Sequence, residues 1–342
     1  MMHYRILSPP FEWPAEFSEI DQKLSALEPL TPASRPQLDR TLFSALNPYW
    51  KKGRACAFWI PEQGHVVGFF HPDVAVEGKS VAFFGYWAAV KDSNVNRELF
   101  SAVEQWSREQ NVTRLVGPLN MKTAFDYRLR LDHWEEPSFW GEPQNPAFYQ
   151  EILQERGYAI CQNYFTDYIE DLERVRKIGR KKLPAFSKSE HDLKFVRFSE
   201  EIFESAKTEI LALANRIFNG NFAFQDLTPF DFAVLYNAET LRLACKKTSF
   251  LLYDYQGSLC GLCLNFADPN DAKRILVKTI GIDPNSRNSG RTFASCLKYL
   301  FEHSDDYDKM AFCLMLKNNQ AHRIATKYSI RERSYALFLK EI

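Results

Sequence analysis

The pattern of apolar and polar positions is clearest over residues 274–301. In residues 274–282, the stretch after Arg274 is largely apolar and β-branched with Lys278 as its one charged residue, which predicts a central strand that is covered on both faces. Turn-forming residues follow at 283–286, and from Phe293 onward apolar residues recur at helical spacing. This stretch therefore predicts a strand, a loop and a helix.

The loop between this strand and this helix, residues 287–292, is a candidate for binding phosphate. Its small residues leave backbone N–H groups uncovered at the start of a helix, which is the geometry that receives a phosphate group. An ordinary strand-to-helix turn is the alternative. We take the loop as a candidate pyrophosphate cradle.

The rest of the pattern predicts a similar order of elements in both halves of the chain. Each half contains a hairpin of short strands, a helix, a strand, a second helix and a last strand. Aligning Leu99 with Phe293 also aligns Val103 with Leu297, so the apolar faces of two helices coincide. A duplicated domain is the economical explanation.

The predicted fold class is α/β, with two tandem domains that each contain a mixed, mostly antiparallel sheet flanked by helices. We place the N-terminal domain at residues 1–170, a connector at 171–192 and the C-terminal domain at 193–342. The connector carries a run of basic residues, which predicts a solvated linker or a contact with RNA or an acidic carrier. These residues are Arg174, Arg176, Lys177, Arg180, Lys181, Lys182 and Lys188.

The two halves differ in the loop that precedes the aligned helix. In the first half Asn96 stands in place of Gly290, and residues 92–97 contain no glycine. Without the conformational freedom and the missing side chain of glycine, the amides of this loop are not expected to close on a pyrophosphate. Only the second half should therefore bind a pyrophosphate.

Composition limits the classes of function. Lysine plus arginine and aspartate plus glutamate number 43 each, and a net charge of zero argues against a dedicated nucleic-acid binder. No apolar run approaches 18 residues and the N-terminus lacks a hydrophobic signal core, so we expect a soluble, cytoplasmic protein. Seven irregularly spaced cysteines predict reduced thiols, and the histidines show no metal-ligand spacing, so no metal is expected.

The run TIGIDPNSRNSGRT resembles motif A of the GNAT (Gcn5-related N-acetyltransferase) superfamily, with Arg287 and Gly290 matching and Thr292 replacing the usual Gly or Ala. Several further stretches resemble bacterial tandem-GNAT proteins, which are N-acetyltransferase-like and of largely undefined substrate. The architecture is also similar to that of Fem-type aminoacyltransferases, which use aminoacyl-tRNA. The further stretches are residues 83–87, 116–120, 128–132, 145–146, 267–270 and 334–337.

The resemblance implies a cosubstrate, acetyl-CoA or another acyl-CoA, and a set of residues that bind it. A strand N–H at Ile280 or Ile282 would face the thioester carbonyl. The family's frequent tyrosine acid falls at Ala325, so Tyr328 could substitute, and a core aromatic is the alternative. The implied cofactor-binding residues are Ile280, Gly281, Ile282, Arg287, Asn288, Ser289, Gly290, Arg291, Thr292 and Asn318.

The acceptor side is expected in the first half. Residues 120–128 and 134–145 interleave charged and aromatic residues in a segment too long for a simple connection. Our candidates there are Asp126 and Glu142 for catalysis and Asn120 and Arg128 for substrate binding. The alternative is that the charged residues form surface ion pairs or fix the loop.

Three functions stay open at this point. The first is an N-acyltransferase that moves an acyl group from acyl-CoA to the amine of a small molecule or amino acid. The second is a transferase of Fem-like architecture that depends on aminoacyl-tRNA or an acyl carrier. The third is a catalytically silent GNAT binding module, which the departures at Thr292 and Ala325 suggest.

Overall fold

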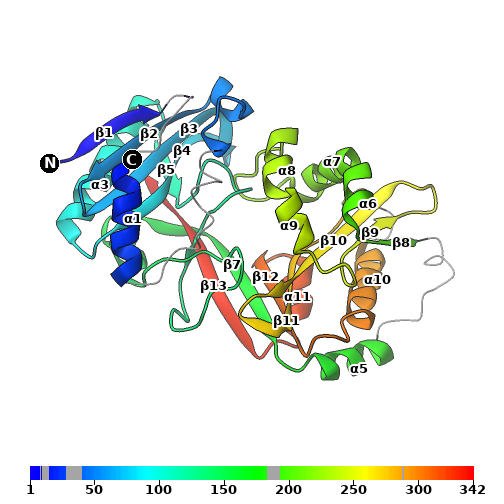
Figure 1. The fold of residues 1–342 in the computed structure, drawn as a ribbon. Helices are drawn as coiled ribbons and strands as arrows, with labels where there is room; N and C mark the ends of the chain where they lie inside the picture. The colour runs from blue at the N-terminus through cyan, green and yellow to red at the C-terminus, as the bar shows by residue number, and fades with distance from the viewer. Residues whose placement is uncertain (8, 10–14, 28–40, 183–192, 287–288) are drawn as a thin grey trace.

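The computed structural model describes residues 1–7, 9, 15–27, 41–182, 193–286 and 289–342. Two lobes stand side by side and share one 13-stranded sheet in the order β1-β2-β3-β4-β5-β13-β7-β12-β11-β10-β9-β8, with β6 pairing β13 (Figure 1). Most neighbouring strands are antiparallel, and β4/β5 and β11/β12 are parallel pairs. The predicted α/β class is confirmed.

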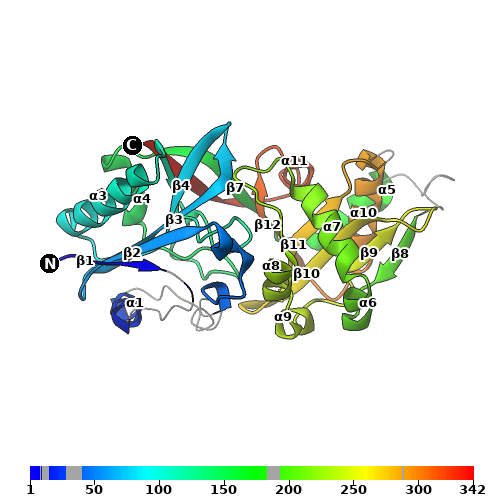
Figure 2. The ribbon, with the colours of Figure 1, turned by 90° about the horizontal axis from the view of Figure 1, so that it is seen from above.

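The first lobe contains β1 (His3–Leu7), β2 (Arg54–Ile60), β3 (Gly64–Val76), β4 (Lys79–Ala89), β5 (Arg114–Gly117) and β6 (Leu129–Arg130). Helices α3 (Ser93–Glu109) and α4 (Phe148–Glu155) cover one face of its sheet, and α1 (Ala15–Leu27) lies on the other (Figure 2). Successive β2 residues alternate between the faces, so Phe58 packs with α3 while Ala57 and Trp59 pack with α1. A short 3₁₀ helix, η1 (Pro48–Lys51), precedes β2.

The second lobe contains β8 (Lys194–Arg197), β9 (Phe250–Tyr253), β10 (Leu259–Asp268), β11 (Asp271–Ile282) and β12 (Lys309–Leu316). One face packs on α5 (Leu172–Lys182) and α10 (Ser289–Glu302), where Ile275 and Val277 meet Leu297. The other face packs on α6 (Glu200–Ser205), α7 (Lys207–Phe218) and α9 (Ala238–Arg242). Helices α8 (Pro229–Leu235) and α11 (Gln320–Ala325) lie toward the first lobe (Figure 1).

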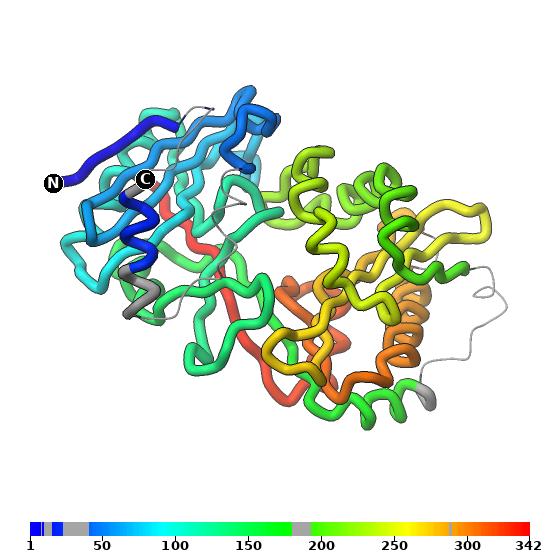
Figure 3. Tube along the Cα trace, in the orientation of Figure 1, coloured from blue at the N-terminus to red at the C-terminus, as the bar shows by residue number. Residues whose placement is uncertain are grey.

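The last strand of each half lies against the sheet of the other half. Strand β13 (Arg331–Glu341) pairs with β5, and β7 (Ala159–Ile169) pairs with β12. The two strands are antiparallel neighbours and run together between the lobes (Figure 3). The boundaries that we proposed at residues 170 and 193 thus divide the chain but do not divide the sheet.

Part of the basic connector is helical. Helix α5 buries Leu172 and Val175, and Arg176 pairs with Glu173 and donates to the Ser304 carbonyl at 2.8 Å. The side chains of Arg180, Lys181, Lys182 and Lys188 lie outside the described part of the chain. The contact with RNA or an acidic carrier stays a prediction.

None of the helices in the described part of the chain combines the length and apolarity that crossing a lipid bilayer requires.

Candidate functional site

The parallel strands β11 and β12 separate partway along their length. They pair only over residues 274–277 and 309–312, although β11 continues to Ile282 and β12 to Leu316. Leu314 adopts a φ of 57°, and the register of β12 against β7 shifts at this point. Past Val277, backbone groups of β11 that point away from β10 no longer bond to β12, so the sheet opens.

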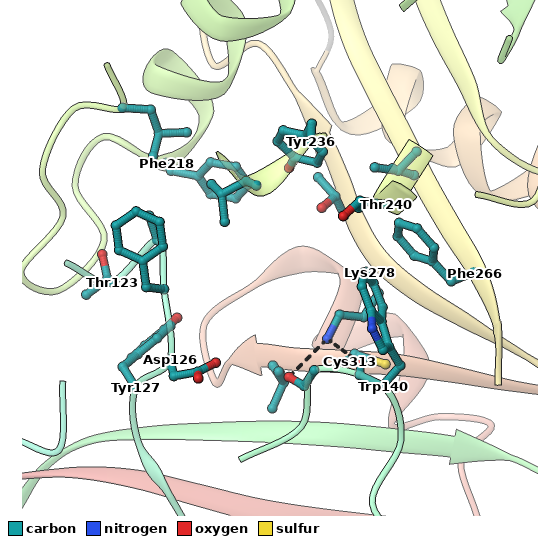
Figure 4. Close-up of a pocket in the computed structure, with 18 of the residues that line it drawn as sticks. Thr123, Asp126, Tyr127, Trp140, Phe218, Tyr236, Thr240, Phe266, Lys278 and Cys313 are labelled. Carbon is teal, nitrogen blue, oxygen red and sulfur yellow. Dashed lines mark hydrogen bonds between the residues drawn. The ribbon is translucent and has the colours of Figure 1, made fainter. Parts of the chain in front are cut away.

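A cavity of about 1740 Å³ lies at this opening, between the two lobes. The first half contributes a loop at residues 123–128 with Trp140 and Tyr164, and the second half contributes residues 277–280, 312–316 and the chain from 218 to 243. Figure 4 shows Phe218 and Tyr236 on the side of the second half and Asp126 and Tyr127 on the side of the first. Both halves therefore form the cavity wall.

The wall is mixed, with slightly more apolar than polar surface and many aromatic side chains. The chain around α7, α8 and α9 and the strands β10 and β12 contribute most of its apolar residues. Since apolar side chains bind the apolar part of a ligand, the cavity fits an amphiphilic molecule better than a fully polar one. The aromatic residues are Phe125, Tyr127, Trp140, Tyr164, Phe218, Phe222, Phe224, Phe230, Tyr236, Phe266 and Phe312.

A buried ion pair fixes the first-half loop to the second half. Lys122, whose exposed fraction is 6%, donates to Asp231 of α8 at 2.7 Å. Asp231 also accepts from the backbone and hydroxyl of Thr228, which caps α8. Backbone bonds from Asn120 to Asp126 and from Arg128 to Pro118 close the loop. The cavity wall is thus anchored on both sides.

The charged side chains at the cavity come from both halves. Asp126 is exposed, and Arg128 is buried between the rings of Tyr127 and Tyr164, at 3.7 and 4.1 Å from their centroids. Lys278 is half-buried on β11 and donates to the carbonyls of Trp140 at 3.2 Å and Gly141 at 3.4 Å (Figure 4).

Burial shifts the pKa values of groups at the cavity. Burial lowers the pKa of Lys278, and it raises the pKa of the Cys313 thiol to about 12. Burial also raises the pKa of Tyr236, whose hydroxyl is hydrogen-bonded to Thr279. Cys313 and Tyr236 are therefore neutral at physiological pH.

The corresponding opening in the first half is closed by the chain itself. Strands β4 and β5 pair only at Ala82 and Phe83, after which Leu119 donates to the Phe84 carbonyl at 2.7 Å. The Asn120 side chain accepts from the Tyr86 amide at 2.7 Å. A Cβ at Gly85 would lie 2.4 Å from Asn120 Oδ1, so no space is left there.

The start of the first-half helix α3 is also capped from within the chain. The Asp92 carboxylate accepts from the amides of Asn94 at 2.8 Å and Val95 at 3.1 Å. These amides would otherwise be available to an anion.

No protein-family model matches the chain. The bacterial ceramide synthase of Caulobacter vibrioides (strain NA1000 / CB15N) is 24% identical over 277 residues, which cover 77% of this chain and 70% of the relative. A solved tandem GNAT protein from the clavulanic acid biosynthesis pathway matches at a TM-score of 0.52 and 12% identity, over 100% of this chain and 98% of its own. The chain has the tandem GNAT fold.

A second solved structure agrees with this assignment. A probable N-acyltransferase from Enterococcus faecalis V583 matches at a TM-score of 0.57 and 11% identity, over 100% of this chain and 73% of its own. The resemblance to tandem GNAT proteins that motif A indicated is confirmed at the level of the fold.

In the GNAT fold of this chain, the predicted cofactor-binding residues follow β11 into α10. Ile280 lines the cavity, and Gly281 and Ile282 continue the strand beside β10. Ser289, Gly290 and Arg291 are exposed at the start of α10, whereas Thr292 is buried. Arg287 and Asn288 lie outside the described residues.

The predicted motif B asparagine lies next to the residue that caps α11. Asn318 is exposed, while Asn319 lines the cavity and accepts from the Ala321 amide at 2.8 Å. The structure thus favours Asn319 over Asn318 at the opening.

Three of the five residues predicted for catalysis or substrate binding do not line the cavity. Glu142 is buried and accepts from Arg333 at 2.6 and 2.7 Å and from the Tyr335 hydroxyl. Asn120 is held by Tyr86, and half-buried Tyr328 packs on the core beside α10. Their polar atoms or rings contact other parts of the fold, and their roles in catalysis or substrate binding stay predictions.

Sequence reasoning missed several residues at the cavity, among them Lys278, Tyr236 and Cys313. Lys278 alone carried a signal, because it is the one charged residue in the apolar part of β11, residues 275–282. Tyr236 follows a helix of seven residues, which is too short for a clear periodic pattern.

Two clusters of described residues bring three potential metal ligands together. One is His133, Glu135 and Glu136, and the other is Asp167, His322 and Glu332. In the second, His322 Nδ1 lies 2.8 Å from Asp167 Oδ2 and the ring stacks on Phe165. An ion pair between β7 and α11 is sufficient to explain that cluster.

Proposed function

We propose that this protein is an N-acyltransferase that moves an acyl group from acyl-CoA to the amine of a small amphiphilic molecule. The fold that it shares with N-acetyltransferases supports acyl transfer as the general chemistry. The observation that carries the proposal is the cavity of about 1740 Å³, lined by many aromatic and aliphatic side chains, that meets the opening between β11 and β12.

The size and lining of the cavity favour a long-chain acceptor or a long acyl group. Pockets for ordinary small ligands measure about 300–1,000 Å³. Each buried CH₂ group contributes about 0.8 kcal/mol, so a long chain gains affinity from the apolar wall. One relative is named a bacterial ceramide synthase, and a ceramide is an N-acylated long-chain amine. That name is consistent with the substrate class proposed for this protein.

The donor would bind along β11 and the start of α10. Space at Gly290 supports this proposal, because among the described residues a Cβ built there has only Gln320 Nε2 within 4 Å, at 3.8 Å. Amides at the start of a helix favour an anion, and the first half has its equivalent amides occupied by Asp92. The residues that would hold acyl-CoA are Ile280, Gly281, Ile282, Arg287, Asn288, Ser289, Gly290, Arg291 and Thr292.

The transfer forms a bond between the amine nitrogen and the carbonyl carbon and breaks the carbon–sulfur bond of the thioester. Asp126 is the candidate that takes the proton from the amine, since its carboxylate is exposed at the cavity. Tyr236 replaces Tyr328 as the candidate that returns a proton to the sulfur, because it lines the cavity and burial keeps its hydroxyl protonated.

A turnover assay with purified protein tests this proposal. Acetyl-CoA and palmitoyl-CoA are each combined with glucosamine, lysine, hexadecylamine and sphinganine, and the amide product is measured by mass spectrometry. We expect a long-chain amine to be acylated with at least about tenfold higher kcat/KM than glucosamine or lysine. Preferred turnover of the polar amines, or no turnover with any pair, would contradict the proposal.

A further inference from the structure

Arg128 is a buried cation without a carboxylate partner. Its exposed fraction is 6%, and no carboxylate of the described residues lies within ion-pairing distance of its guanidinium. Its guanidinium donates to the Leu314 carbonyl, at 3.1 Å from Nη1, and Nε has no hydrogen bond among the described residues. A guanidinium carries five N–H donors, so most of its hydrogen-bonding capacity is unused.

Lys278 of β11 shares this feature and comes from the second half of the chain. Its ammonium group contacts two carbonyl oxygens, and among the described residues no carboxylate lies within 4.0 Å of it. Like Arg128, it lines the cavity.

Other buried cations among the described residues pair with a carboxylate or donate several hydrogen bonds. Lys122 pairs with Asp231 at 2.7 Å, and Arg333 pairs with Glu142 at 2.6 Å. Arg130 donates through three nitrogens to backbone carbonyls and a hydroxyl. Arg128 and Lys278 differ from them in facing a cavity, which suggests that the missing partner is a ligand.

The two cations act on each other. Burial lowers the pKa of Lys278, and the positive charge of Arg128 lowers it further, while Asp126, Glu142 and the Cys313 thiol act in the opposite direction. Two like charges in a partly desolvated space are unfavourable unless an anion lies between them. The two positively charged side chains therefore favour the binding of an anion.

We propose that Arg128 and Lys278 form an anion subsite that binds a carboxylate or phosphate group of the amphiphilic acceptor. The assignment to the acceptor rests on the proposed function. Tyr127 and Tyr164 hold the guanidinium plane in place, so it presents a preorganised fork to two oxygens, while Lys278 adds a point charge from β11. The apolar wall then takes the chain of the same molecule.

Calorimetric titrations with three probes of equal chain length test the subsite: dodecyl phosphate and dodecanoate, each below its micelle concentration, and dodecanol below its solubility limit. We expect at least one anion to bind the native protein about tenfold or more tightly than dodecanol. The tighter of the two anions identifies the group that the subsite prefers. Equal affinity for all three probes would overturn the proposal.

Substitutions locate the effect. Lys278→Met should reduce the preference for the anion to below about threefold and leave dodecanol binding unchanged, because it removes the charge and keeps the apolar stem. Lys273→Met is the matched control, since Lys273 is exposed on the same strand and lies outside the cavity wall. If the Arg128→Gln variant folds, it should also reduce the preference for the anion over dodecanol. If it does not fold, the result for Lys278→Met tests the proposal by itself.

Two further outcomes separate the claims. Displacement of the anionic probe by free CoA would assign the subsite to the donor and overturn the proposal. Retention of the anion preference in a protein that shows no acyl transfer would refute the proposed function and leave the subsite in place, because binding is measured without turnover.

Discussion

At the scale of single residues, Glu142 shows how a charged residue in a long loop can be structural. Arg333, with an exposed fraction of 1%, lies between Glu142 and Glu136, and Tyr335 donates to Glu142. These contacts fix the loop after β6 onto β13. The sequence shows the charges of this loop, but it cannot show that their partners come from the end of the chain.

Replacing Glu142 should therefore lower the free energy of unfolding, and any loss of activity should follow from this loss of stability. Glu142→Ala leaves Arg333 buried with a lost partner, which costs about 3–5 kcal/mol. Urea denaturation of the variant and of Glu135→Ala, an exposed neighbour in the same loop, measures the difference. A Glu142→Ala protein of native stability that had lost only activity would contradict the structural role.

Cys313 gives a pH-dependent prediction at the cavity. Burial raises the pKa of its thiol to about 12, so the thiolate is scarce at pH 8 and increases tenfold with each pH unit up to that value. Alkylation by iodoacetamide at pH 8 should be roughly a thousandfold slower in the native protein than in the unfolded chain. Mass spectrometry of the peptide that contains Cys313 measures both rates, and equal rates would show that the thiol is neither buried nor suppressed.

At the scale of elements, the two parallel strand pairs differ in whether the chain fills the gap between their strands. Past their short ladders, β4 and β5 are bridged by Leu119 and Asn120, whereas β11 and β12 remain open to the cavity. The apolar run at 274–282 predicted β11 correctly, and the glycine-free loop predicted a difference between the halves. Helices α8 and α9 were not predicted, because segments of seven and five residues show too few turns for periodicity.

A matched pair of glycine substitutions tests this contrast. Gly85→Ala places a Cβ 2.4 Å from Asn120 Oδ1 and should destabilise the protein by about 1–3 kcal/mol. Gly290→Ala places a Cβ no nearer than 3.8 Å to Gln320 and should leave the free energy of unfolding nearly unchanged. Thermal unfolding of both variants provides the comparison, and a reversed order would mean that the first-half opening is not closed.

At the scale of the whole molecule, the exchange of β7 and β13 joins the two halves into one sheet. Tyr164 of β7 and Leu314 of β12 both line the cavity, so the exchanged strand helps to form the site. The sequence predicted two similar halves, but not this exchange, because the alternation along a strand does not name its neighbours. The position of the cavity between the halves follows from the exchange and was not predictable for the same reason.

The central claim is that the second half alone binds the acyl donor, and calorimetric titration with acyl-CoA tests it most directly. The claim predicts one acyl-CoA site per chain. Affinity at this site should fall about a hundredfold or more in Gly290→Trp. It should be unchanged in Asn94→Trp, which alters the corresponding helix start in the first half. Two sites per chain, no binding by the native protein, or a loss in Asn94→Trp rather than in Gly290→Trp would contradict it.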